Sequence, residues 1–569
     1  GNCVRVYDLL PPEFYRALYQ HNRKYPDSAI YFFQSVTMPG NIASPYALSE
    51  SSRSEIRRNI EYIVDAVHGK GSIPAVGARK GGTYIQDVSP YLLGFIVETD
   101  TTRATVSALR SSNPGYKYQG EYVSSESGAA EGLIALACDY VFSYSEKTYG
   151  YKPVVGAAGN PALAPSLPWS GNISLDLNSL VASEQAKPHF FLAYQLYPFD
   201  EPVANDRGRY SGYTDENGSL PFGGYLSTFM KTQTRYPVLI DGFGVATNIN
   251  AFEGDSSVNG YTETGQGETL VRMLKAIQKE GCIGGLISDY NDNWYQSSGD
   301  LADFVLPGGS SRIWKNALDP KQNMGVTAVE PVGDGETGMS IQDRGRMREI
   351  QIRHDPAFIY ISLMLDKDID FDNEQLFIGL DTYQRNDGEY RYDPEYFANS
   401  LSGMEYIIKF ESKNSAALYV TPSYNRSRGQ FMSKESYTGR FDFIYQFAYG
   451  SFDSSGNTFY QAGSSVHIRI PWNLLNFTNP SRHMVINDSR PLGSSKMDEF
   501  GLRTVRTDGI IISVLIADKS TKDTLYIFPE SKQSAGYKSF KWNDWDDVDF
   551  AFRQKDSCKI LSNFFNSLK

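Results

Sequence analysis

Side chains able to do chemistry follow the ends of short apolar runs over about the first 290 residues of the chain. Carboxyl groups can move protons or act as nucleophiles, and aromatic rings with a polar edge can stack on a ligand and hydrogen-bond to it. If these runs are parallel strands of a barrel, their carboxyl ends open on a shared mouth, where such side chains meet. The candidates are Tyr7, Asp8, Gln34, Glu98, Asp100, Tyr194, Tyr197, Asp241, Asp289, Asn291, Asp292 and Trp294.

The elements that must position these residues alternate between strand and helix up to about residue 330. Apolar residues at helical spacing, such as Ile56, Ile60 and Ile63, separate the apolar runs. This alternation is typical of an α/β protein with a parallel sheet. We expect its seven strands at 4–10, 29–36, 92–99, 153–158, 190–197, 238–243 and 285–290.

Seven strands are one fewer than a (β/α)₈ barrel of the TIM type requires. The first expected strand lies at the start of the printed sequence, with no helix before it. We therefore expect a barrel that lacks its first strand in this chain, completed by an upstream segment or by a partner chain.

The period changes to two after a glycine-rich acidic stretch at 331–338. Nine short runs with alternating character, separated by polar turns, predict an all-β region that forms a β-sandwich. The expected organisation is an α/β barrel at 1–330, a linker at 331–338 and a sandwich at 339–569. The nine strands are expected at 350–352, 358–365, 376–380, 406–410, 417–420, 443–449, 466–470, 510–517 and 525–528.

Three passages in the first half resemble the clan A glycoside hydrolases and transglycosidases, including the branch that remodels surface β-glucans. NCVRVYDLLPPEFYRAL is similar to the strand-two passage of that clan, YPVLIDGFGVAT to its strand-seven passage and GGLISDYNDNWY to its strand-eight passage. Their order and spacing agree with a barrel. The resemblance implies a (β/α)₈ glycosidase-like domain that acts on a β-linked glycan.

The resemblance also implies catalysis by two carboxylates, one of which protonates the leaving oxygen while the other attacks the anomeric carbon. Glu98, at the end of the fourth barrel strand, matches the acid/base. Gly242 occupies the place of the nucleophile, and glycine cannot attack carbon. Asp241 is one position away, but neighbouring strand residues point to opposite faces, so it would need a local bulge to reach the mouth.

The alternatives to Asp241 as nucleophile are an inverting scheme, in which Asp289 or Asp292 acts through water, or a degenerate barrel. For substrate binding we expect Tyr7, Gln34, Tyr194, Tyr197, Asp289, Asn291 and Trp294. Each expectation has a structural alternative. Glu98 could cap a helix or form an ion pair, the two later tyrosines could belong to the core, and 289–292 could be a solvated loop.

The second half resembles the carbohydrate-binding sandwiches that are often appended to surface glycosidases. The passages VHIRIPWNLLNFTNPS and FKWNDWDDVDFAFRQK carry this resemblance. Trp472, Trp542 and Trp545 could stack on sugar rings, because a flat indole matches a pyranose face. They could equally be core residues of the sandwich.

Composition excludes several other classes of function. The net charge of −12 provides no positive electrostatic field that would attract nucleic acid. No apolar run in the sequence is close to about 18 residues, the length needed to span a bilayer. The six histidines and four cysteines form no zinc motif, so we expect no metal and no cofactor.

Two hypotheses follow. The chain is a glycoside hydrolase or transglycosidase acting on a β-linked oligo- or polysaccharide, with an altered nucleophile. Alternatively, it is a non-catalytic glycan-binding or assembly module, a pseudoenzyme that is attached to a membrane glycan synthase in one version of this hypothesis. Both predict an extracellular or cell-surface location.

Overall fold

The computed structural model describes residues 3–38, 46–75, 81–99, 101–165, 173–198, 207–249, 260–296, 313–332, 336–425, 434–453, 456–487, 504–533 and 537–568. Asp100 and the linker residues 333–335 lie outside these ranges. The chain divides into two compact units. The first comprises residues 1–244, 268–288 and 561–569, and the second comprises 245–267 and 289–560.

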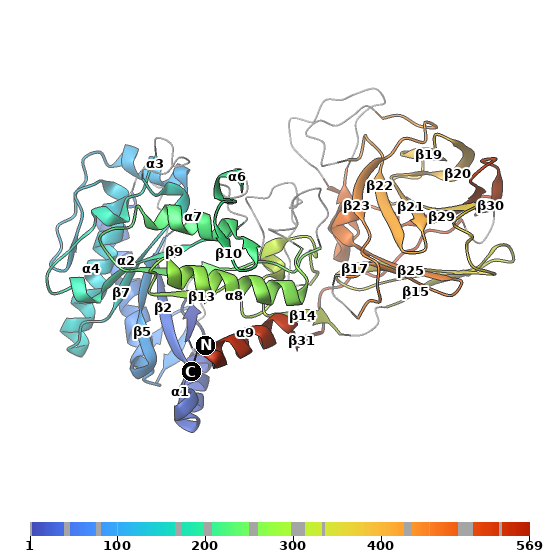
Figure 1. Cartoon of the computed structure of the whole chain (residues 1–569). Coiled ribbons are helices and arrows are strands. Elements are labelled where there is room, and N and C mark those ends of the chain that lie inside the picture. Colours follow the sequence, from blue (N-terminus) through green and yellow to red (C-terminus); the bar gives the residue numbers. More distant parts are fainter. Residues whose placement is uncertain are drawn as a thin grey trace. The chain divides into compact units, whose positions relative to one another are not determined.

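The first unit is built on one sheet of seven parallel strands, in the spatial order β1-β2-β5-β7-β9-β12-β13 (Figure 1). The strands at the two ends of this order lie near each other, so the sheet forms a nearly closed barrel. Each strand falls on one of the seven apolar runs, which confirms the predicted fold class. The strands are β1 (Cys3–Val6), β2 (Tyr31–Thr37), β5 (Leu92–Glu98), β7 (Val155–Gly159), β9 (Phe190–Gln195), β12 (Val238–Phe243) and β13 (Gly284–Ile287).

Helices connect these strands and cover the outside of the barrel. In α1 a proline occupies the first turn, where its missing N–H group leaves no hydrogen bond unmade. In α2 the residues at helical spacing, among them Ile56, Ile60 and Ile63, are buried. The helices of this region are α1 (Pro12–Lys24), α2 (Glu50–Val67), α3 (Arg103–Ser112), α4 (Ala129–Tyr149), α6 (Arg207–Tyr210), α7 (Pro221–Met230) and α8 (Glu263–Lys279).

The second unit contains two antiparallel sheets that pack face to face as a β-sandwich (Figure 1). All nine predicted strands are present within these sheets. The five-stranded sheet, in spatial order, consists of β15 (Glu336–Gln342), β16 (Met347–His354), β17 (Phe358–Leu365), β25 (Ser465–Pro471) and β24 (Phe459–Ala462). The six-stranded sheet consists of β23 (Asp442–Gln446), β22 (Ser415–Val420), β21 (Tyr406–Ser412), β18 (Glu374–Asp381), β29 (Ile511–Asp518) and β30 (Thr524–Phe528).

The sandwich core lies between the facing sides of these sheets. Alternate residues of β17 are buried, as period-two patterning requires. Trp472 and Trp542 are part of this core, and the Trp545 ring packs against it. The core alternative is therefore the one observed for these tryptophans.

A hairpin adds a further layer over the outer face of the six-stranded sheet. Its strands are β19 (Glu389–Asp393) and β20 (Tyr396–Met404), and Tyr392, Tyr396 and Met404 form a second apolar cluster with Phe377 and Ile407 of the sheet. Strands β18 and β21 are apolar on both faces because both faces are covered.

Short ribbons complete the described structure. They are β3 (Gly71–Ile73) with β4 (Gly82–Tyr84), β6 (Val123–Ser124) with β8 (Val181–Ala182), β10 (Thr214–Asp215) with β11 (Gly218–Ser219), β14 (Thr327–Pro331) with β31 (Phe550–Gln554), and β26 (Phe477–Asn479), β27 (Met484–Ile486) and β28 (Thr504–Arg506) as one sheet. The chain closes with α9 (Asp556–Ser567). Within the described ranges, every helix is too short or too polar to cross a bilayer.

Candidate functional site

The inside of the barrel has an apolar lower layer. Strand side chains alternate between the helix side and the barrel interior, and one set of alternate residues forms a cluster at the centre. A packed interior of this kind supports polar side chains at the strand ends above it. The cluster consists of Phe33, Ile96, Ala158, Phe191, Ala193, Leu239 and Leu286.

Above this layer, Arg5 of β1 joins the two candidate catalytic carboxylates. Its Nη1 donates to Asp241 Oδ2, its Nη2 donates to Glu98 Oε2, and its Nε donates to Ser35 Oγ at 3.0 Å. All three guanidinium nitrogens are therefore used within the barrel. We call Arg5, Ser35, Glu98 and Asp241 the arginine cluster.

Asp241 shares the inner face of β12 with Leu239, which lies two residues earlier and belongs to the central cluster. Regular alternation therefore turns Asp241 toward the barrel interior, and the local bulge expected for it is not needed. The register of β12 shifts next to Asp241, between Ile240 and Gly242 relative to β9 and between Ile240 and Phe243 relative to β13.

The space beside Gly242 is filled by neighbouring side chains. A Cβ atom at this position would lie 2.8 Å from the Tyr197 hydroxyl and 2.9 Å from Cγ of Gln195. The Tyr197 hydroxyl donates to Ser288 Oγ at 3.1 Å. A larger side chain at position 242 would therefore have to displace Tyr197.

Burial dominates the electrostatics of Asp241, whose side chain is 1% exposed. It raises the pKa of this carboxyl group to about 6, although the Arg5 guanidinium acts in the opposite direction. Burial also lowers the pKa of Arg5, but the carboxylates of Asp241 and Glu98 raise it by more, so that it lies above its ordinary value. Within the part of the chain that the structure describes, Asp241 Oδ1 has no hydrogen-bond partner.

Glu98 is the more accessible of the two carboxylates. Its side chain is 20% exposed, and its Oε1 accepts a hydrogen bond from Thr37 Oγ1 at 3.1 Å. The ring of Tyr7 lies against Arg5, with 4.1 Å between the guanidinium carbon and the ring centroid. Tyr7 is 41% exposed, so it covers the cation and still presents surface to solvent.

The structure places Gln34 and Tyr194 on the helix side of the sheet, away from the arginine cluster. Gln34 is buried and accepts a hydrogen bond from the Tyr15 hydroxyl of α1 at 2.7 Å. Tyr194 donates to Gln233 Oε1 at 3.2 Å, and its ring packs on Phe229 of α7. Their substrate-binding roles stay predictions, and their observed contacts are those of packing residues.

The remaining predicted binding residues belong to the second unit. Asp289 Oδ2 accepts a hydrogen bond from Gln296 at 3.4 Å, and Asn291 forms a β-bridge with Thr327. The buried indole of Trp294 donates to the Val329 carbonyl at 3.3 Å. The neighbouring Asp292, also a candidate, is bound by Lys555 at 2.8 Å and by Lys315 at 3.2 Å.

Arg5 is the functional residue that the choice of strand ends missed. It is in β1, and Tyr7 follows that strand two positions after it, so alternation predicts that both side chains share a face. Arg5 also lies within NCVRVYDLLPPEFYRAL, the passage that resembles the strand-two pattern of clan A. Because alternate strand residues share a face, the sequence could have predicted that Arg5 points toward the two carboxylates.

No family model matches the sequence, and no curated protein matches it either. Solved structures that are similar to the chain include several glycoside hydrolases.

One of these structures is an endo-laminarinase from Formosa, with 10% identity and a TM-score of 0.34 over 57% of this chain and 74% of that one. Another is a family 17 β-1,3-glucanosyltransferase from Rhizomucor miehei, with 11% identity and a TM-score of 0.29 over 58% and 82%. A β-glucuronidase from Bacteroides uniformis has 10% identity and a TM-score of 0.30 over 78% of this chain, which spans 45% of that protein.

Proposed function

We propose that this chain is a glycosidase-like barrel protein that binds a β-linked glycan without cleaving it. The observation that carries the proposal is the state of the nucleophile position. Gly242 has no side chain, the Tyr197 hydroxyl fills the space beside it, and the neighbouring carboxylate of Asp241 is buried on Arg5.

A retaining glycosidase needs a carboxylate oxygen that can touch the anomeric carbon of its substrate. Both oxygens of Asp241 are withdrawn from solvent, one of them in the ion pair with Arg5. Glu98 keeps some exposure, but one exposed carboxyl group without an accessible nucleophile does not complete double displacement.

Recognition of a glycan is supported by the three sequence passages and by the exposed ring above the arginine cluster. Tyr7 presents an aromatic face with a hydroxyl at its edge, which suits the C–H faces and hydroxyl groups of a sugar. This function also carries the proposal of an extracellular or cell-surface location, where such glycans are found.

The test measures cleavage and binding on the same material. The chain is incubated with β-1,3- and β-1,4-linked glucans and mixed-linkage glucan, and released reducing ends and transferred glycosyl units are quantified. We expect no product above that of a Glu98→Gln/Asp241→Asn double variant, together with retarded migration of the wild-type chain in gels containing one of the glucans. Product that disappears in the double variant would overturn the non-catalytic proposal.

A second candidate function, retaining hydrolysis with Asp241 as the relocated nucleophile, is favoured by one observation. Asp241 and Glu98 bind the same guanidinium, so that the two carboxylates are neighbours. Under this alternative, the single variant Asp241→Asn abolishes turnover while leaving glucan binding intact. Absence of turnover in the wild type removes the alternative.

A further inference from the structure

The sandwich contains a pocket on the outer face of its six-stranded sheet, the face turned away from the core. Along β21 and β22, residues such as Tyr406, Ile408 and Leu418 point into the core. Because side chains alternate, Ile407, Lys409 and Tyr419 point to the opposite face, and all three line the pocket. The sheet therefore forms the floor of the pocket.

The walls come from two segments that cross this face. The β19–β20 hairpin contributes Glu389, Tyr392, Asp393 and Pro394. The segment around the start of β23 contributes Glu435, Thr438, Gly439, Arg440, Phe441 and Asp442. Glu389 holds the two walls together, because one of its carboxylate oxygens accepts from both the backbone N–H and the hydroxyl of Thr438, at 2.8 and 2.6 Å. The cavity measures about 460 Å³, a volume typical of small-ligand sites.

Among the described residues that line the pocket, two buried hydroxyl groups have no hydrogen-bond partner, those of Thr421 and Tyr392. Thr421 follows β22 and is 3% exposed, and in the described part of the chain no donor or acceptor lies within hydrogen-bond distance of its Oγ1. A buried hydroxyl that is left unpaired destabilises the fold, and native proteins keep few of them. Its position in the lining of a cavity indicates a group that a ligand satisfies.

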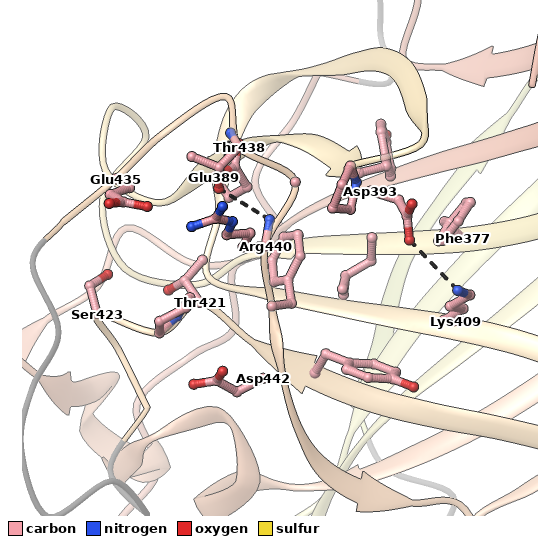
Figure 2. A pocket seen from close by; sticks show the side chains of 17 residues that line it. Phe377, Glu389, Asp393, Lys409, Thr421, Ser423, Glu435, Thr438, Arg440 and Asp442 are labelled. Carbon is pink, nitrogen blue, oxygen red and sulfur yellow. Dashed lines mark hydrogen bonds and ion pairs between the residues drawn. The ribbon is translucent and has the colours of Figure 1, made fainter.

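The other lining groups define the chemistry of that ligand. Lys409 and Asp393 lie at one end beside the Phe377 ring, and Thr421, Ser423 and Glu435 lie at the other (Figure 2). Tyr419 and Phe441 add aromatic surface to the lining, the first from the sheet and the second from the segment before β23.

The charges in the lining disfavour an anion. Its four carboxylates are those of Glu389, Asp393, Glu435 and Asp442, and its two cations are Lys409 and Arg440. Lys409 is itself shared between Asp393 at 3.6 Å and Glu411 at 3.8 Å. A neutral ligand with many hydroxyl groups can donate to these carboxylates and accept from these cations, without introducing a charge that must be desolvated.

We propose that this pocket binds a neutral sugar unit of a glycan, with the unpaired Thr421 hydroxyl as one of its hydrogen-bonding groups and the Tyr419 ring as a stacking surface. This inference rests on the proposed glycan-binding function and adds a recognition site separate from the arginine cluster. The three tryptophans predicted to stack on sugars in this unit, Trp472, Trp542 and Trp545, belong to the core or pack on it.

The test is calorimetric titration of the full chain with laminaritriose and cellotriose. The pocket variants are Thr421→Val and Tyr419→Ala. Their controls are Thr524→Val, an exposed threonine on β30, and Phe397→Ala, an exposed ring on β20 outside the lining. For the trisaccharide that the wild type binds, we expect affinity to fall about three- to tenfold in Thr421→Val and at least tenfold in Tyr419→Ala, with the controls unchanged.

Three results are informative. Weaker binding in both pocket variants, together with weaker binding of glucuronic acid than of glucose by the wild type, supports a neutral-sugar site. Unchanged affinity in the pocket variants overturns the inference and leaves the proposed function standing. A wild-type chain that binds neither trisaccharide and none of the glucans contradicts the proposed function, and with it the inference.

Discussion

The arginine cluster of the barrel and the pocket of the sandwich contain the same kinds of side chain in opposite states. In the barrel, two carboxylates share one guanidinium, and the Tyr197 hydroxyl fills the space at Gly242. In the sandwich, the floor and walls line a cavity of about 460 Å³, and within the described part of the chain the Thr421 hydroxyl has no partner.

This difference separates residues that resemble an active site from residues able to bind. Charged groups that form ion pairs only with one another stabilise the fold, whereas polar groups without a hydrogen-bond partner at a cavity are available to a ligand. The two carboxylates predicted for the barrel site, Glu98 and Asp241, are both bound to Arg5. The sandwich, in whose sequence we find no catalytic pattern, has a cavity that can hold a ligand.

The largest expected effect on stability follows from removing the guanidinium of the arginine cluster. Arg5→Met leaves Glu98 and Asp241 without their shared cation, and we expect the free energy of unfolding to fall by about 3–5 kcal/mol. Urea denaturation followed by circular dichroism measures it. Lys117→Met, which removes an exposed ion pair with Glu126, should cost less than about 1 kcal/mol. Equal costs for the two variants would show that the cluster is not a closed structural unit.

A smaller effect is expected from adding a single methyl group beside Tyr197. Gly242→Ala places a Cβ 2.8 Å from the hydroxyl, so we expect a loss of about 1–3 kcal/mol. The loss should shrink in a Tyr197→Phe background, which a double-mutant cycle detects. Gly212→Ala is the matched control, because a Cβ there meets no atom within 4 Å. A neutral Gly242→Ala variant would mean that the position has room for a side chain.

The pH dependence of stability should reveal the buried carboxyl group. The pKa of Asp241 is about 6 in the fold and about 3.9 in an unfolded chain. Its contribution to stability is therefore complete below about pH 4 and is lost as the pH rises through about 6. We expect the stability difference between wild type and Asp241→Asn to shift in favour of the wild type by on the order of 1 kcal/mol between pH 7 and pH 5. A pH-independent difference would place Asp241 in contact with solvent.

The smallest effect on stability is expected in the sandwich pocket. Thr421→Val removes a hydroxyl that has no partner in the described structure, so the unfolding free energy should change by less than about 0.5 kcal/mol or rise slightly. Thermal unfolding of the unliganded chain measures it. A fall in the free energy of unfolding above about 1 kcal/mol would show that this hydroxyl stabilises the fold itself. The pocket would then resemble the arginine cluster instead of differing from it.

The sequence was sufficient to predict most strands of both units. The run at 238–243 coincides with β12, and that at 358–365 coincides with β17, because buried runs bounded by polar turns are a strong local signal. Strands with less apolar character, such as β15 and β19, were missed. Their residues are polar on at least one face and pair with strands that supply the burial.

The site was less predictable because its geometry depends on distant parts of the chain. Arg5 and Asp241 are separated by 236 positions, and no local sequence pattern shows that their side chains meet. The sandwich pocket requires the β19–β20 hairpin to cross the outer face of the sheet. The one available signal was that β18 and β21 are apolar on both faces, which indicates a covering layer.

The most direct test of whether Asp241 is inaccessible to substrate is covalent labelling at the nucleophile position. Epoxide or aziridine reagents of β-glucosyl, β-galactosyl and β-glucuronyl configuration react with an accessible catalytic carboxylate, and the product is detected by intact-protein mass measurement. An active retaining β-glucosidase in the same experiment confirms that its matched reagent reacts. We predict no added mass on this chain, because Asp241 is buried on Arg5. An ester adduct mapped to Asp241 would contradict the account and identify a working nucleophile.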